Sequence, residues 1–225
     1  MIADLFSIIL LGAGFLTIFG IGEILYHFFN VKAEYTRKLS HVATGLLTLL
    51  FPIYLSSHWS VLLLCSSFAV LLLSSLKFNF LKSINAVDRL TWGSLLYPAI
   101  VYICYIIYSF HNNLIFFYLP ILIMAKSDPI AALVGKRFPY GKFKIFNDNK
   151  TLSGSLAFFI SAIIISIVLF NMLTAFSIAT ILCLSTIIAL ATAITEAISS
   201  KGFDNLTIPL TAVCILIIYF EFFIY

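Results

Sequence analysis

"KSDPIAALVGKRFPYGKFKIFNDNKTLSGS", residues Lys126–Ser155, interrupts a chain that is otherwise almost entirely apolar. The segment is polar and basic, it contains glycine and proline, and strongly apolar sequence flanks it on both sides. A connection between two antiparallel helices needs only a few residues. A polar segment of this length therefore indicates a place where the protein handles charged groups.

The composition around this segment is that of a membrane protein. The chain has 225 residues, of which 62% are hydrophobic and 10% are charged, and its mean hydropathy is +1.13. Soluble domains average roughly 45–50% apolar and about 25% charged residues. Because a chain this apolar would aggregate in water, we predict an all-α polytopic membrane protein and expect no nucleic-acid partner.

Apolar runs of about 17–25 residues are long enough to cross a bilayer as helices, and the sequence predicts about eight. They are Leu5–Phe29, Leu39–Leu55, Trp59–Leu76, Trp92–Phe110, Leu114–Ala125, Leu152–Phe170, Thr174–Ser199 and Leu206–Phe223. The fifth run is too short unless residues from Lys126–Val134 extend it. The loops are too small for a soluble domain, so residues 1–225 are expected to form one integral membrane domain.

The basic residues fall only in alternate loops. These loops follow the first, third, fifth and seventh predicted helices and contain Lys32, Arg37, Lys38, Lys77, Lys82, Arg89, Lys126, Lys136, Arg137, Lys142, Lys144, Lys150 and Lys201. By the positive-inside rule these loops are cytoplasmic, and both termini lie on the outer side. Orientation alone would explain Lys77, Lys82 and Lys201, but it does not require the six basic residues between 126 and 150.

Carboxylates map to the same predicted membrane face. They are Glu34, Asp88, Asp128, Asp148, Glu196 and Asp204. Lys and Arg neutralise phosphate oxygens, carboxylates hold Mg²⁺, and glycine backbone approaches phosphates closely. Phosphoryl transfer needs little beyond positioning and charge stabilisation. A polar face on an apolar protein therefore favours a nucleotide and a substrate with a polar head and an apolar tail.

Two motifs within the polar segment have both structural and functional interpretations. In "SDPIAALVG", Asp128 can cap a helix whose first position is Pro129, with Gly135 near its end, or it can be a metal ligand or base. In "NKTLSGSLAFF", Lys150 can be a phosphate ligand or only an interfacial lysine, and Thr151 can cap the following helix. "GKRFPYGK" is not a Walker A loop, because its glycine spacing differs and no Ser or Thr follows the lysine.

Two further motifs lie at predicted helix ends on the same face. In "YTRKLSHVATG", Arg37 and His41 are four residues apart and share a helix face. Cations at a helix N-terminus oppose its dipole, which favours an anion as their ligand over a role as interfacial anchors. "TEAISSKGFDNLTIPL" ends the seventh predicted helix and begins the eighth, and its Asp204 or Asn205 can act as a cap.

Taken in order, these motifs resemble those of the CTP-dependent polyprenol and lipid kinases, a family that includes dolichol, phytol and CTP-using diacylglycerol kinases. "RKLSH" resembles the family's Arg-Lys-x-x-His element, and "DPIAALVGKRF" its Asp-x-x-Ala-x-x-x-Gly element. "NKTLSGS", "EAISSKGFDNLTIPL" and "WGSLLYP" (Trp92–Pro98) are similar to three others. Ser153 stands where the family often has Glu, and Pro139-Tyr140 lengthens the segment before Gly141.

The resemblance implies transfer of the CTP γ-phosphate to a membrane lipid alcohol, with a divalent cation such as Mg²⁺. We expect the segment at about 126–151 to be a cytoplasmic nucleotide-binding loop. The expected catalytic residues are Arg37, Lys38, Asp128 and Lys150. The expected nucleotide-binding residues are Gly135, Lys136, Lys142, Thr151, Gly154 and Asn205, and the expected metal ligands are Asp128, Glu196 and Asp204.

Two other functions share parts of this pattern. A CTP:phosphatidate cytidylyltransferase also joins CTP to a lipid, but the region Glu196–Pro209 lacks that family's His-Gly-Gly and Asp-Arg-x-Asp signature. A transporter would place polar residues at mid-membrane depth on several helices. Glu23 is the main residue of that kind in the sequence, so a transporter is the weaker alternative.

Overall fold

The structure, a computed structural model, describes residues 4–86, 92–146 and 148–223. Asp88 and Arg89 lie outside these residues. The helices in chain order are α1 (Leu5–His27), α2 (Ala33–Thr48), α3 (Phe51–Tyr54), α4 (His58–Phe78), α5 (Lys82–Asn85), α6 (Gly93–His111), α7 (Ile115–Leu122), α8 (Asp128–Arg137), α9 (Leu152–Leu173), α10 (Ile178–Ile198) and α11 (Asp204–Phe223). A π-helical segment (Ile123–Ser127) joins α7 to α8, and strands β1 (Lys142–Ile145) and β2 (Asp148–Thr151) form a hairpin.

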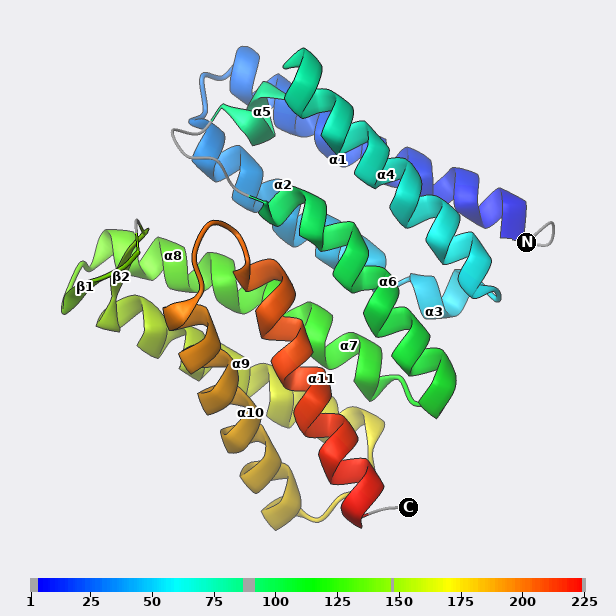
Figure 1. Cartoon of the computed structure of the whole chain (residues 1–225), viewed down its shortest axis with the longest axis vertical. Coiled ribbons are helices and arrows are strands. Elements are labelled where there is room, and N and C mark those ends of the chain that lie inside the picture. The colour runs from blue at the N-terminus through cyan, green and yellow to red at the C-terminus, as the bar shows by residue number, and fades with distance from the viewer. Residues whose placement is uncertain (1–3, 87–91, 147, 224–225) are drawn as a thin grey trace.

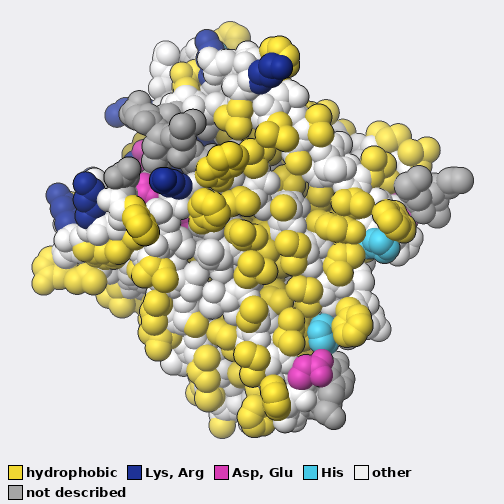
Figure 2. All heavy atoms as spheres, in the orientation of Figure 1, with side chains coloured by type: hydrophobic (Ala, Val, Ile, Leu, Met, Phe, Trp, Pro, Cys, Tyr) yellow, Lys and Arg dark blue, Asp and Glu magenta, His cyan; other side chains and the backbone are white. Residues whose placement is uncertain are grey.

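The prediction of an all-α polytopic membrane protein is confirmed. Within the described residues, seven helical segments are long and apolar enough to cross a membrane. Hydrophobic side chains are spread over the whole surface seen in Figure 2, whereas Lys and Arg gather toward one end of it. Apolar side chains such as Ile9, Leu156 and Leu190 are exposed on the outer helix faces, as expected for surfaces that face lipid.

The predicted span 39–55 differs from the other seven. Its helix, α2, begins earlier, at Ala33, has 16 residues and is followed by the single turn α3. It is not among the seven apolar spans, because its 16 residues make it shorter than each of them. Its buried face also carries hydroxyl groups. Those buried hydroxyls belong to Thr36, Ser40, Thr44 and Thr48.

The fifth span is completed by residues from the polar segment, as the sequence requires. α7, the π segment and α8 together run from Ile115 to Arg137. Asp128 is therefore inside a continuous helical segment with helical backbone angles, and the prediction that it caps a new helix is wrong. Pro120 lies within α7. The stretch expected as a loop is thus mostly helix and hairpin.

The hairpin is a feature that the sequence pattern indicates only faintly. β1 and β2 pair antiparallel, with Lys142 opposite Thr151 and Ile145 opposite Asp148. Its Lys-Phe-Lys-Ile alternation is the period-two signal of a strand, but four residues are few for such a signal. Thr151 ends the hairpin and caps α9, accepting a hydrogen bond from the Gly154 N–H at 3.1 Å. The predicted Thr151 cap is therefore confirmed.

The helices form one bundle in which two groups meet (Figure 1). α1, α2, α4, α5 and α6 make up one group, and α7 to α11 make up the other, with the hairpin projecting from one end. α2 contacts the π segment where the groups meet, and Gly45 lies at this contact. A Cβ atom on Gly45 would come within 2.6 Å of the Tyr97 hydroxyl and would overlap the Ala125 side chain.

At the end of α1 far from the hairpin, Asp4 forms hydrogen bonds with residues at the start of α4 and just before it. Its carboxylate accepts hydrogen bonds from the hydroxyls of Ser56 and Ser60, both at 2.7 Å, and from the backbone N–H groups of Ser56 and Ser57. Burial alone would raise the pKa of Asp4, but the hydrogen bonds from Ser60 and Ser56 lower it to about 2.

Candidate functional site

The junction between the π segment and α8 presents Asp128 to α2. The Lys38 Nζ atom lies 3.5 Å from the Asp128 Oδ2 atom, and both side chains are largely buried. Lys38 is on the first turns of α2, so this ion pair links the two groups of helices. The predicted catalytic residues Lys38 and Asp128 therefore lie together, although 90 residues separate them in the sequence.

Lys150 and Glu196 form a second ion pair beside the first. Lys150 extends from β2, donates a hydrogen bond to the Glu196 backbone carbonyl at 2.8 Å, and pairs with its carboxylate Oε1 atom. The Glu196 side chain is only 6% exposed, so the lysine neutralises a charge that would otherwise be costly to bury. The other carboxylate oxygen, Oε2, is buried and has no hydrogen-bond partner.

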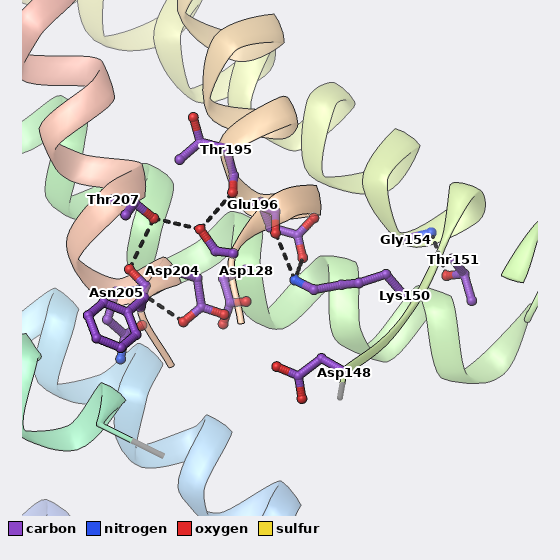
Figure 3. Close-up of polar contacts among 12 residues, drawn as sticks. Asp128, Asp148, Lys150, Thr151, Gly154, Thr195, Glu196, Asp204, Asn205 and Thr207 are labelled. Carbon is purple, nitrogen blue, oxygen red and sulfur yellow. Dashed lines mark hydrogen bonds and ion pairs between the residues drawn. The ribbon is translucent and has the colours of Figure 1, made fainter. Parts of the chain in front are cut away.

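The start of α11 contributes Asp204 and Asn205. Figure 3 shows the Asp204 and Asp128 side chains next to each other, close enough for their charges to repel. The Asn205 amide donates a hydrogen bond to the Gly93 carbonyl at 2.8 Å, and this bond ties α11 to α6. We call Arg37, Lys38, Asp128, Lys150, Glu196, Asp204 and Asn205 the polar cluster.

The set of donors in the polar cluster fits a divalent cation with phosphate. Within the described residues, no three His, Cys, Asp or Glu side chains already converge as a cation site. Mg²⁺ is commonly held by one or two carboxylates together with substrate phosphates. The adjacent Asp128 and Asp204, and the unpartnered Oε2 of Glu196, are the oxygens that would meet this requirement.

Four predicted nucleotide-binding residues, Gly135, Lys136, Lys142 and Gly154, are not part of the polar cluster. Lys136 pairs with Glu34, and Lys142 is exposed on β1. Gly135 and Gly154 face each other where α8 crosses α9, and a Cβ on either would lie 3.5 Å from the other's Cα. Burial alone would raise the pKa of Glu34, but Lys136 lowers it below its ordinary value. Their roles toward a nucleotide stay predictions.

An apolar cavity of about 490 Å³ opens beside the polar cluster. α1, α2, α4 and α6 provide most of its wall, and its apolar lining includes Phe15, Phe19, Phe51, Leu64, Phe68, Leu72, Tyr97 and Val101. Arg37 and Asn205 belong both to the polar cluster and to this lining. The Arg37 Nε atom is buried and lacks a hydrogen-bond partner, so a cation faces this end of the cavity unpaired at that atom.

A polar stripe on α2 runs along the cavity. Arg37, Ser40, His41, Thr44 and Thr48 all line it, at the spacing of one helix face. The predicted shared face of Arg37 and His41 is confirmed. The sequence did not assign His41 a site role of its own, and the four-residue spacing was the available signal. Glu23, the residue that favoured a transporter, accepts the Ser83 N–H and pairs with His27.

Comparison with known proteins identifies a relative over most of the chain. The chain is similar to the phytol kinase of Synechocystis sp. (strain ATCC 27184 / PCC 6803 / Kazusa), with 30% identity over 201 residues. The aligned residues cover 89% of this chain and 84% of that protein. No family model and no solved structure matches. The similarity therefore extends over nearly the whole chain and is not limited to one motif.

Proposed function

Because this chain belongs to the family of CTP-dependent lipid kinases, and is a lipid kinase of that family, we propose that CTP is its phosphate donor and a membrane lipid alcohol its acceptor. The observation that carries the proposal is that the polar cluster adjoins an apolar cavity, with Arg37 and Asn205 belonging to both. Charged groups for a triphosphate and space for a hydrocarbon tail lie side by side there.

In this proposal the cations of the polar cluster bind the triphosphate. Lys38, Lys150 and Arg37 come from β2 and the start of α2, so they approach the same volume from two directions. Charge-assisted hydrogen bonds from such groups stabilise phosphate oxygens strongly. The existing ion pairs with Asp128 and Glu196 hold the lysines in place before the nucleotide arrives, which reduces the ordering required at binding.

Asp128 and Asp204, with Glu196, would hold Mg²⁺ against the phosphates. A bound Mg²⁺ would supply positive charge next to the phosphate oxygens during transfer. The lipid oxygen forms a bond to the γ-phosphorus, and the bond from that phosphorus to the β–γ bridging oxygen breaks. CDP leaves, and the hydroxyl proton is lost to water.

The test is the fate of the γ-phosphate. Purified protein in lipid nanodiscs is incubated with CTP labelled at the γ-phosphate, Mg²⁺ and a lipid alcohol, and the lipid and aqueous phases are separated. A kinase places the label on the lipid. Label recovered as pyrophosphate would instead identify a cytidylyltransferase. The same assay with labelled ATP measures the nucleotide preference, and equal rates with ATP would contradict the CTP assignment.

A further inference from the structure

The two faces of the hairpin carry different lysines. Its pairs are Lys142 with Thr151, Phe143 with Lys150, Lys144 with Asn149, and Ile145 with Asp148. Residues directly opposite each other in an antiparallel pair share a face, and neighbours along a strand alternate between faces. One face therefore presents Lys150 to the polar cluster and Asp148 to the α10–α11 turn, where its carboxylate accepts the Lys201 N–H at 2.8 Å. The opposite face, which we call the outer face, carries the exposed Lys142 and Lys144.

The outer face lies at the level of a membrane surface. The hairpin joins two helical segments that are each long and apolar enough to cross a membrane, the first ending at Arg137 and the second beginning at Leu152. The Leu152 side chain is 57% exposed and packs against Gly141, since a Cβ on Gly141 would overlap it. Gly141 immediately precedes Lys142. The outer face is therefore continuous with the surface of α9 that is expected to face lipid.

Three exposed aromatic side chains flank the lysines of the outer face. Phe138, Tyr140 and Phe146 are 62%, 78% and 78% exposed. The backbone beneath the first two is held in place, because the Ser153 hydroxyl donates to the Phe138 carbonyl and the Ser153 N–H donates to the Tyr140 carbonyl at 3.4 Å. Aromatic rings concentrate at the interfaces of a bilayer. Exposed rings on a fixed backbone at this level therefore indicate contact with lipid.

Phe146 has a backbone conformation that is costly for its residue type. Its φ is 50°, in the left-handed region, where a bulky side chain is uncommon. Burial within the protein offsets little of this cost, because the side chain remains largely exposed. An apolar partner outside the chain is the ligand that a ring held in this way suits.

The charges beside these rings are positive and are not balanced within the part of the chain that the structure describes. Lys136 pairs with Glu34, but no described carboxylate forms an ion pair with Arg137, Lys142 or Lys144. Lysine and arginine side chains near an anionic membrane surface are attracted to it over about one Debye length. Three cations next to three exposed rings match a surface that is negative at its headgroups and apolar beneath them.

We propose that the outer face of the hairpin, with Lys142 and Lys144 and the rings of Phe138, Tyr140 and Phe146, binds the headgroups of anionic phospholipids in the adjoining leaflet. The lysines contact the lipid phosphates, and the rings enter the layer beneath them. Zwitterionic headgroups carry no net charge, so they attract the lysines less. The hairpin is then held between the bilayer on its outer face and the polar cluster on the other. This placement assigns Lys142 to lipid and not to the nucleotide.

Lipid-selective quenching of fluorescence tests the proposal. Tyr140→Trp places an indole reporter two residues from Lys142, and the variant is reconstituted in two sets of nanodiscs with the same mixture of phosphatidylcholine and phosphatidylglycerol. Bromine, which quenches tryptophan at short range, is carried by phosphatidylglycerol in one set and by an equal amount of phosphatidylcholine in the other. The wild-type signal from Trp59 and Trp92 is subtracted. We expect at least about twofold more quenching by brominated phosphatidylglycerol. Equal quenching by the two lipids, or quenching by neither, would overturn the proposal.

Charge variants test the role of the two lysines. With the reporter present, Lys142→Gln combined with Lys144→Gln should make quenching by the two lipids equal, whereas Lys142→Arg combined with Lys144→Arg should retain the preference. High salt should act like the Gln substitutions, since the Debye length falls from about 10 Å at about 0.1 M to about 3 Å at about 1 M. A preference that survives the loss of both lysines would overturn the proposal. Loss of the preference on addition of MgCTP would assign the lysines to the nucleotide, with the same consequence.

A reporter at the other end of the bundle is the matched control. Phe110 is 82% exposed near the C-terminal end of α6, whose N-terminal end adjoins the polar cluster through Asn205. The sequence from 90 to 125 contains no Lys or Arg. The Phe110→Trp reporter should be quenched equally by the two brominated lipids. The same preference at this position would mean that anionic lipid surrounds the whole protein, and it would contradict a site on the hairpin.

Phe146→Gly separates the contribution of the rings from that of the charges. It should lower quenching of the Tyr140→Trp reporter by both lipids and keep the preference for the anionic one, because the lysines remain. The midpoint of thermal unfolding should be unchanged or higher, since glycine adopts a positive φ without strain. Unchanged quenching by both lipids would contradict insertion of the ring into the bilayer.

Discussion

The two groups of helices in this bundle are packed very differently. In the second group, α7 and the π segment are surrounded by neighbours, and Phe116, Phe117, Leu119, Ile121 and Ile123 are completely buried. In the first group, α1, α2, α4 and α6 border a partly open cavity of about 490 Å³. Protein interiors are normally packed to crystal-like density. The contrast is between a closely packed second group and a first group that leaves space between its helices.

The two groups of helices also contribute different charged residues to the polar cluster. Every carboxylate of the polar cluster, Asp128, Glu196 and Asp204, comes from the second group, whereas Arg37 and Lys38 come from α2 of the first. The packed group therefore provides all the carboxylates of the site together with Lys150, and α2 provides the other two cations and part of the cavity wall. The following variants either break this division of roles or sharpen it.

The largest effect is expected from Asp128→Asn, which removes a carboxylate that the second group contributes to the site. It should lower turnover by about 10³-fold or more, because the side chain can no longer hold a cation against the phosphates. Turnover of γ-labelled CTP measures the change, and thermal unfolding in detergent checks the fold. Glu221→Gln also replaces a carboxylate by an amide, but at an exposed position near the C-terminal end of α11, far from Asp204. It should leave turnover unaffected. Near-normal activity of Asp128→Asn would exclude it from catalysis.

Lys150→Ala should have the next largest effect, and it should change both nucleotide binding and protein stability. The KM for CTP should rise about 10- to 100-fold as a phosphate ligand is lost. Stability should fall by about 3–5 kcal/mol, because the buried Glu196 is left without its partner. Lys77→Ala, at an exposed lysine of the first group, is the control for both measurements. A normal KM in a destabilised variant would make Lys150 a structural partner of Glu196 only.

How much of this arrangement the sequence predicts depends on the kind of signal. Asp128 and Lys38 were identified from residue types at helix ends, and they form a pair although distant in sequence. The cavity could not be foreseen, because the residues that line it are the same apolar types that face lipid elsewhere. The π segment was missed for a similar reason: Pro129 reads equally well as the first residue of a new helix. The cavity and the π segment both depend on how segments pack against one another, and the periodicity of apolar residues in the sequence carries no information about that packing.

A smaller effect is expected where the two groups touch. Gly45→Ala places a methyl group against Ala125 and the Tyr97 hydroxyl, and overpacking of this kind costs about 1–3 kcal/mol. Gly20→Ala is the matched control, since nothing lies within 4 Å of a Cβ at that position, and it should be neutral or slightly stabilising. Thermal unfolding of both variants decides the point. Equal stability of the two would mean that the groups are loosely joined.

The smallest effect is expected from Asp4→Asn, far from the polar cluster and within the first group. Loss of the charge-assisted hydrogen bonds to Ser56 and Ser60 should cost about 1 kcal/mol at neutral pH. Because the pKa of Asp4 is lowered to about 2, its contribution is complete above about pH 4 and is lost as the pH falls toward 2. The stability difference from wild type should shrink over that range. A constant difference would mean that the carboxylate charge is irrelevant.

The π segment holds one residue more than the same turn of an α-helix would, because its hydrogen bonds join residues five apart and not four. Removing one residue from Ile123–Ser127 would restore ordinary helical winding and leave Asp128 on the same side of the helix, facing Lys38 and Asp204. A relative that lacks this residue would therefore retain the polar cluster. Alignments that forbid gaps within membrane helices would shift Asp128 by one position and misjudge such a relative.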